Sequence, residues 1–169
     1  MEKCTFRVGQ MFLQFPDTCI HDCKRLSVLG SNIRFLPVME LGCKNLVTLF
    51  LGKLELKEIT ESFLCGLTSV RVLDLGDTQI KSLPLSLWEL RQLKFLNLSW
   101  NEIENVGECI GNLSSLHFLN LIHCIKFKSL PFQIVKLKNL RYFDFSECDN
   151  LRLILKEITI LPNCEKIMQ

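Results

Sequence analysis

The residues of this chain that could carry out chemistry are its nine cysteines and three histidines. The densest group is Cys19-Ile20-His21-Asp22-Cys23, which contains residue types that bind zinc. A structural zinc site takes four ligands, with a second ligand pair at a defined spacing, and no Cys-x-x-Cys pair exists to supply it. An odd number of cysteines without paired spacing favours reduced thiols in the cytosol. We therefore expect no metal site and no disulfide framework.

Catalytic motifs are equally absent from the sequence. His123 beside Cys124 is the best candidate for a base and a nucleophile, but we expect the two side chains to point to opposite sides of a turn. The sequence contains no G-x-x-x-x-G-K-[ST] phosphate loop, no G-x-S-x-G and no H-E-x-x-H. We expect no catalytic residues and no cofactor, and hence no enzyme.

Composition and charge argue against further classes of protein, those that bind nucleic acids or span membranes. A net charge of +2 argues against a nucleic-acid surface, and the longest apolar runs fall short of the roughly 18 residues that a membrane span needs. The first twenty residues contain Glu2, Lys3 and Arg7 and show no convincing secretory segment. We expect one domain with a sizeable core, located in the cytoplasm.

A repeat accounts for the arrangement of most of the chain. Six copies of a Leu-x-x-Leu-x-Leu pattern begin at residues 23, 46, 70, 93, 116 and 140, which are 23 or 24 residues apart. The first two copies match the pattern least closely. The most regular copies continue with x-x-Asn-x-Ile or a variant of it. A period of 20–29 residues with this pattern is the signature of leucine-rich repeats.

The repeat predicts an α/β solenoid. Leucines at alternate positions indicate a strand with one buried face, and the strands of successive repeats must stack in parallel to share one core. A Leu-Pro step follows the turn, as at Leu83-Pro84, and a short apolar segment such as 87–90 then returns along the convex side. We expect about six repeats with a parallel concave sheet and a short helical or irregular convex side. The expected divisions are a linker over 1–22, the repeats over 23–150, and an incomplete terminal repeat or partial cap over 151–169.

We number positions within a repeat from its first leucine. Position nine turns the chain away from the strand, and its residues are small and mostly polar, suited to bonding backbone groups of the neighbouring repeat. This predicted structural turn ladder consists of Thr78, Asn101, Cys124 and Cys148.

Positions three, five, seven and eight are expected to face outward from the concave sheet. Position three carries aromatic rings in three successive repeats, which either stabilise the sheet as a stacked ladder or form part of a binding surface. Acidic residues on the same face predict a partner with basic and apolar contacts, although ordinary solvated charge is an equally good explanation. The candidate protein-binding residues are Asp74, Asp77, Phe95, Asn97, Trp100, Glu102, Phe118, Asn120, His123, Tyr142, Asp144 and Glu147.

The amino-acid sequence of the repeats resembles that of plant nucleotide-binding leucine-rich-repeat immune receptors. The resemblance rests on residues 71–90, 94–101, 110–113 and 141–145. The start of the repeats also resembles that of the coiled-coil class of these disease-resistance proteins. The resemblance there rests on Phe6-Arg7-Val8-Gly9 followed by Lys24-Arg25-Leu26-Ser27-Val28.

The resemblance implies a sensor and autoinhibitory role in plant defence. Expected partners are proteins: a pathogen effector, a guarded host protein or a nucleotide-binding domain. The family's phosphate-loop domain and signalling N-terminus are not among these residues, so nucleotide binding is not carried over. The chain is therefore expected to be a receptor fragment, a decoy or a remnant, and marginally soluble when expressed alone.

Two other functions remain open. One is a free-standing cytosolic scaffold that binds small GTPases or other signalling proteins through its repeats. The other is an extracellular receptor ectodomain, because Asn97-Leu98-Ser99 and Asn112-Leu113-Ser114 are glycosylation sequons, although Asn97 is expected to lie in a strand.

Overall fold

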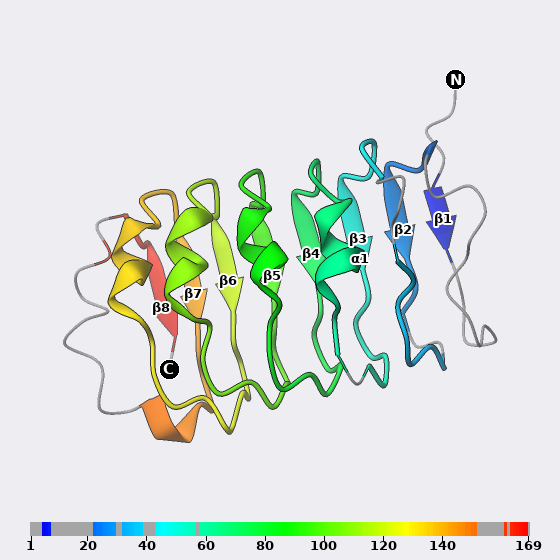
Figure 1. Ribbon diagram of the computed structural model, residues 1–169. Coiled ribbons are helices and arrows are strands. Elements are labelled where there is room, and N and C mark those ends of the chain that lie inside the picture. Colours follow the sequence, from blue (N-terminus) through cyan, green and yellow to red (C-terminus); the bar gives the residue numbers. More distant parts are fainter. Residues whose placement is uncertain are drawn as a thin grey trace.

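The chain folds into one arc of stacked repeats. The computed structural model describes residues 5–7, 22–29, 32–38, 43–56, 58–151, 161 and 163–168. Within these residues eight short strands form a single parallel sheet in the order of the sequence (Figure 1). The strands are β1 (Thr5–Arg7), β2 (Arg25–Ser27), β3 (Thr48–Phe50), β4 (Val72–Asp74), β5 (Phe95–Asn97), β6 (Phe118–Asn120), β7 (Tyr142–Asp144) and β8 (Lys166–Met168).

Residues at the same position of neighbouring repeats lie side by side in the sheet. Leu73 pairs with Leu96, and Leu96 pairs with Leu119. The backbone ladder continues beyond the strands, because the position-six amide donates to the position-five carbonyl of the next repeat, as from Leu75 N to Asn97 O at 2.9 Å. A residue type that recurs every 23 or 24 residues is therefore stacked into a row across the sheet.

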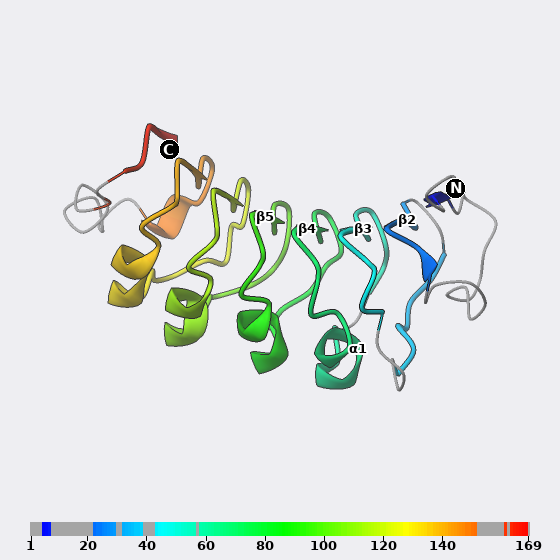
Figure 2. The same cartoon turned by 90° about the horizontal axis from the view of Figure 1, so that it is seen from above.

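Short helical segments cover the convex side, opposite the strands (Figure 2). Pro84 and Pro131 lie directly before two of these segments with φ −70°, where the missing proline amide breaks no bond of the helix. The segments are α1 (Glu61–Cys65), η2 (Leu85–Glu89), η3 (Glu108–Asn112), η4 (Phe132–Lys136) and η5 (Asp149–Leu151). Of these, η5 lies closer to the turn edge, the edge of the solenoid at which the strands end and the chain turns toward the convex side (Figure 1).

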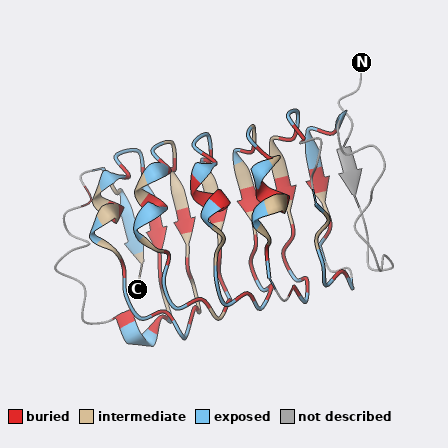
Figure 3. Ribbon diagram, in the orientation of Figure 1, coloured by how far each residue is buried: buried red, intermediate tan, exposed pale blue. Residues whose placement is uncertain are grey.

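The core lies between the sheet and the convex segments (Figure 3). In the repeat that begins at Val70, the side chains of Val70, Leu73, Leu75 and Ile80 are all 0% exposed. Fully burying one such side chain contributes roughly 1.5–3 kcal/mol. Because each repeat covers the apolar edges of its two neighbours, this contribution depends on stacking and not on any repeat alone.

The sheet extends past both ends of the six expected repeats. β1 lies within the expected linker, where Phe6 pairs with Leu26. β8 lies within the expected incomplete terminal repeat or partial cap, where Ile167 pairs with Phe143. Residues 152–160, part of that cap, lie outside the described residues. The division of the chain into linker, repeats and cap thus stays a prediction, and strands continue into both flanking segments.

Asn101 at position nine is the centre of the turn between β5 and the convex side. Its Nδ2 donates to the carbonyl oxygens of Leu75 at 2.7 Å, of Leu98 at 2.9 Å and of Ser99 at 3.2 Å. Its Oδ1 accepts from Ile80 N at 3.1 Å and from the neighbouring threonine of the ladder. One buried amide therefore satisfies backbone groups of two repeats that would otherwise have no partner.

The other members of the turn ladder make part of the same set of bonds. The Oγ1 of Thr78 donates to Leu75 O at 2.8 Å. The Sγ of Cys124 donates to Leu98 O at 3.2 Å, and the Sγ of Cys148 donates to Leu121 O at 3.0 Å. In each cysteine turn the thiol reaches the position-six carbonyl of the preceding repeat, which is one of the carbonyls that an asparagine amide reaches.

Glu61 provides a second link between repeats on the convex side. Its Oε1 accepts from Leu85 N and its Oε2 accepts from Ser86 N, both at 2.7 Å, so α1 caps the free amides of η2. The nearby Ser86 hydroxyl, together with the Ser86 and Leu85 amides, holds the pKa of Glu61 below its ordinary value.

We predict that Asn101→Ala lowers the free energy of unfolding by about 3 kcal/mol, because buried carbonyls and amides of two repeats lose their partner. Urea unfolding followed by circular dichroism measures this change. Asn112→Ala, which removes an exposed amide on η3, is the control and should leave the midpoint unchanged. Equal midpoints for the two variants would contradict the role assigned to Asn101.

We predict that Glu61→Gln destabilises the fold at pH 7 by on the order of 1 kcal/mol at most, because the bonds lie at a largely solvated surface. A lowered folded-state pKa stabilises the fold above the ordinary glutamate pKa, and this contribution is lost as the pH falls through the folded-state value. The gap between wild type and variant should therefore narrow on acidification from pH 7 to below about pH 4.5. Urea midpoints measured across this pH range test the prediction, with Glu108→Gln on η3 as the control; a gap that stays constant would refute it.

Candidate protein-binding face

The aromatic residues at position three stack across three strands. The rings of Phe95 and Phe118 lie 4.6 Å apart with their planes 7° from parallel, which matches the spacing of neighbouring strands. The ring of Tyr142 lies 6.2 Å from Phe118, tilted by 39°, and Tyr142 is 41% exposed. The half-buried phenylalanine pair thus stabilises the sheet, while the tyrosine at the end of the row faces solvent.

Aspartate and asparagine side chains at position five close the turns that follow the strands. In each, Oδ1 accepts a hydrogen bond from the backbone amide two residues later, a bond typical of these two residue types. The amide of Asn97 also donates to Asp74 Oδ1 at 2.8 Å. The bonds to backbone amides are Asp74 to Gly76 at 2.9 Å, Asn97 to Ser99 at 3.1 Å, Asn120 to Ile122 at 2.9 Å and Asp144 to Ser146 at 3.0 Å.

Two of the expected binding residues are less available to a partner than the repeat pattern indicated. Asp144 is only 5% exposed, and its Oδ1 also accepts from Ser146 Oγ at 2.7 Å. Its carboxylate therefore serves the turn and is not available to a partner. Glu102 lies one residue past the asparagine turn, where Lys126 binds its carboxylate at 2.7 Å and Lys81 lies 3.9 Å away.

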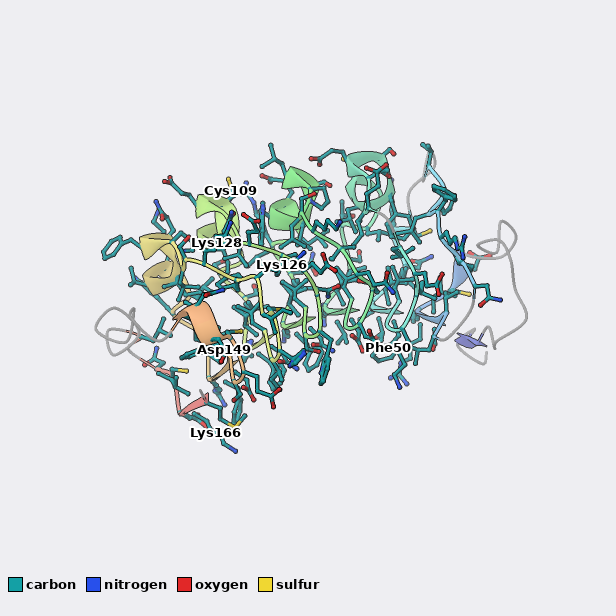
Figure 4. The ribbon with its side chains drawn as sticks, turned by 90° about the horizontal axis from the view of Figure 1, so that it is seen from below. Phe50, Cys109, Lys126, Lys128, Asp149 and Lys166 are labelled. Atoms are coloured by element: carbon teal, nitrogen blue, oxygen red, sulfur yellow. The ribbon has the colours of Figure 1, made fainter. Side chains whose placement is uncertain are left out.

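Glu102 thus belongs to a row of ion pairs along the turn edge. A parallel pair joins Lys128 to Glu104 at 2.7 Å. Lys126 and Lys128 lie between the strands and the convex segments, whereas Phe50 of β3 lies on the strand side (Figure 4). Hydrogen bonds and charge from the lysines lower the pKa of both glutamates. Such exposed pairs contribute little to stability, and they keep Glu102 away from the concave face.

Position eight has a left-handed backbone in five successive repeats. Its amide donates to the position-seven carbonyl of the next repeat, as from Trp100 N to Ile122 O at 2.8 Å. Left-handed backbone is uncommon for residues other than glycine and is an outlier for a bulky side chain. The residues and φ angles are Lys53 at 60°, Asp77 at 56°, Trp100 at 59°, His123 at 56° and Glu147 at 63°.

Three of these position-eight side chains form a chain of contacts across neighbouring repeats. Glu147 Oε2 lies 2.8 Å from His123 Nδ1. The imidazole stacks on the indole of Trp100, with ring centroids 3.8 Å apart and planes at 28°. Trp100 nevertheless stays 53% exposed. The binding candidates of this row are therefore brought together by the fold.

Position seven forms a floor below this row instead of projecting outward. Gly52, Gly76 and Ser99 are all buried, and between the position-eight side chains they leave an open hollow of about 680 Å³. The hollow was not foreseen from the repeats. The small residues in consecutive copies of position seven were the signal that could have revealed it.

The described residues contain no arrangement suited to catalysis at the histidine–cysteine pair. The thiol of Cys124 is directed into the core, where the adjoining Cys148 thiol and burial raise its pKa. The ring of His123 lies on the opposite side, against Trp100. A thiolate and a base therefore do not share a site.

The described part of the chain contains neither a metal-binding cluster nor a helix that could span a membrane. There, no cluster of three or more histidine, cysteine or acidic side chains could hold a metal ion. Cys19 and His21 of the N-terminal cysteine–histidine group lie outside the described residues. Among the helices that are described, none has the length and apolar character needed to cross a membrane.

Comparison with known proteins agrees with the repeat architecture. Residues 62–168 match the family described as "Leucine-rich repeat region". An internalin, InlF of Listeria monocytogenes, superposes with a TM-score of 0.70 over 88% of this chain and 42% of its own, at 20% identity, which shows the fold alone.

Sequence relatives come from Arabidopsis thaliana. A probable disease resistance protein, At1g61190, is 30% identical over 147 residues, which are 85% of this chain and 15% of that protein. The disease resistance protein RPS5 is 29% identical over 170 residues, 98% of this chain and 19% of that protein. The chain thus spans less than a fifth of the length of these relatives. It belongs to the leucine-rich-repeat family, and the repeats of plant disease resistance proteins are among its relatives.

Proposed function

We propose that the chain is a non-catalytic protein-recognition module, the sensor and autoinhibitory segment of a plant intracellular immune receptor acting in the cytoplasm. The relatives named disease resistance proteins support the context. The observation that carries the proposal is Trp100, a large aromatic side chain that is half exposed and held in a left-handed backbone. Stability gives no reason for tryptophan at such a position, whereas strained and exposed aromatic residues are typical of binding sites.

The chemistry of the concave face limits the class of partner. Asp77 and Glu147 are exposed carboxylates. Asp77 lines the hollow together with Trp100, and Glu147 contacts His123. Such a surface suits a protein with basic and apolar groups, and its carboxylates repel the phosphates of nucleic acids. The partners we propose are a pathogen effector, a guarded host protein or a nucleotide-binding domain. The alternative is a cytosolic scaffold for small GTPases, for which no contact of the described residues provides separate support.

The size of the face fits a part of a larger interface. Eight strands spaced about 4.8 Å apart make a sheet roughly 34 Å wide. The five positions from three to seven are roughly 17 Å long, so the flat face is on the order of 600 Å². A standard interface takes about 800 Å² from each partner. Further repeats of a longer receptor would complete it, in agreement with the small share of the relatives that this chain spans.

We predict that Tyr142→Ser weakens partner binding about tenfold, as expected for an exposed aromatic anchor. Phe132→Ser is the matched control, because Phe132 is 63% exposed on the convex η4. Tagged wild-type and variant chains would be expressed in plant leaves, checked for cooperative melting, and compared by quantitative mass spectrometry of the proteins they capture.

The proposal requires that proteins captured by the wild type are depleted with Tyr142→Ser and retained with Phe132→Ser. Equal depletion with both variants would exclude the concave face as the binding surface. Capture of small GTPases in place of the proposed partners would support the scaffold alternative.

A further inference from the structure

The hollow at the turn edge of the concave face is lined by residues of four neighbouring repeats, from Leu29 to Trp100. Its floor consists of Gly52, Gly76 and Ser99, and its walls include Trp100 and Asp77. With about 680 Å³ it has the size of a small-ligand pocket, although it is open to solvent.

Close packing explains the two glycines in the floor of the hollow. A Cβ atom on Gly76 would lie 2.6 Å from Asn97 Nδ2 and 3.1 Å from Ser99 Oγ. A Cβ atom on Gly52 would lie 3.1 Å from the carbonyl oxygen of Gly76. Contacts below 3.0 Å force neighbouring atoms to shift, so glycine is the residue that fits at position 76. The hollow therefore follows from the way these repeats are packed.

Trp100 presents one face of its indole to the hollow. The His123 ring covers the opposite face at 3.8 Å, and Glu147 holds that histidine at 2.8 Å. Trp100 lines the hollow, whereas His123 does not. The indole is thus fixed from behind, and a planar group in the hollow could stack on its open face without ordering the tryptophan first.

The charges around the hollow favour a cation. Within the described part of the chain, the carboxylate of Asp77 has no hydrogen-bond or ion-pair partner. Asp74 accepts two hydrogen bonds at Oδ1, from Gly76 N and Asn97 Nδ2, and among the described residues its Oδ2 accepts none. Lys53 forms the opposite wall and has no ion pair with either aspartate among the described residues. Two aspartates and one lysine give the lining a net charge of −1, which a single guanidinium would neutralise.

We propose that this hollow binds an arginine side chain presented by the protein partner. The guanidinium stacks on the open face of Trp100, and its amino groups donate to the carboxylate of Asp77 and to Oδ2 of Asp74. Arginine fits better than lysine, because a planar cation can stack on an indole and bond a carboxylate at two points. This inference rests on the proposed protein-recognition function and specifies the chemistry of the partner.

Fluorine NMR of protein labelled with 5-fluorotryptophan tests the site. The chain has two tryptophans, and Trp88 is 2% exposed in the core, so its signal is an internal reference. The probe is N-acetyl-arginine methylamide, and the uncharged isostere N-acetyl-citrulline methylamide is its control. We expect a saturable shift of the Trp100 signal alone, with a Kd on the order of 1–10 mM for a single side chain, and no shift with citrulline.

Asp77→Asn tests the carboxylate. Asparagine tolerates the left-handed backbone that Asp77 adopts, so the fold should be kept while arginine binding weakens about fivefold through loss of the charged hydrogen bonds. Glu108→Gln removes a carboxylate on the convex η3 and should leave binding unchanged.

Equal shifts with arginine and citrulline, an unchanged Kd in Asp77→Asn, or parallel shifts of both tryptophans would each overturn the arginine site. These results are independent of the Tyr142→Ser capture experiment. If Tyr142→Ser loses the captured proteins but the wild-type chain binds no arginine, only the arginine site is refuted. Arginine binding by a chain whose captured proteins do not depend on Tyr142 would instead contradict the proposed use of the concave face.

Discussion

The rest of the structure depends on how backbone groups are satisfied where each strand ends. A parallel stack of three-residue strands leaves carbonyls and amides at every turn, and buried groups of this kind must be paired. Asn101 pairs those of two repeats through one amide. Because these bonds join position nine of one repeat to positions six, nine and eleven of the preceding repeat, they also fix the register. All rows of the concave face, aromatic or acidic, are consequences of that register.

The same requirement explains why the polar residues of the face are not equally available. At position five the carboxylate or amide is bound to the turn that follows it, as in Asp74 and Asp144. At position eight the backbone makes the interrepeat bond, and the side chain is free to project, as in Asp77 and Trp100. Backbone bonding thus separates residues that build the face from residues that can serve a partner.

The period of the sequence was sufficient to predict the parallel sheet and the rows of equal positions, because in-register stacking follows directly from a constant repeat length. It placed no strand in the incomplete terminal repeat or partial cap expected over 151–169, although Ile167 of β8 keeps the apolar residue of position four. It also gave no sign that Asp144 is buried. Periodicity also says nothing about backbone angles, so neither the left-handed position eight nor the hollow above Gly76 could be derived from it.

The structure also separates two explanations of the aromatic residues that the sequence left open. Phe95 and Phe118 stack at strand spacing and are half-buried, so sheet stability is sufficient reason for them. Sheet stability is not a sufficient reason for Trp100. Its ring stacks on a histidine that is itself held by Glu147, yet more than half of Trp100 is open to solvent. A contact chain across three repeats that orders an exposed indole costs conformational entropy in the free protein, and this cost is recovered when a partner covers the ring. The centre of recognition is therefore expected at position eight, beside the hollow, with the exposed Tyr142 as a further anchor and without a direct role for the half-buried phenylalanines.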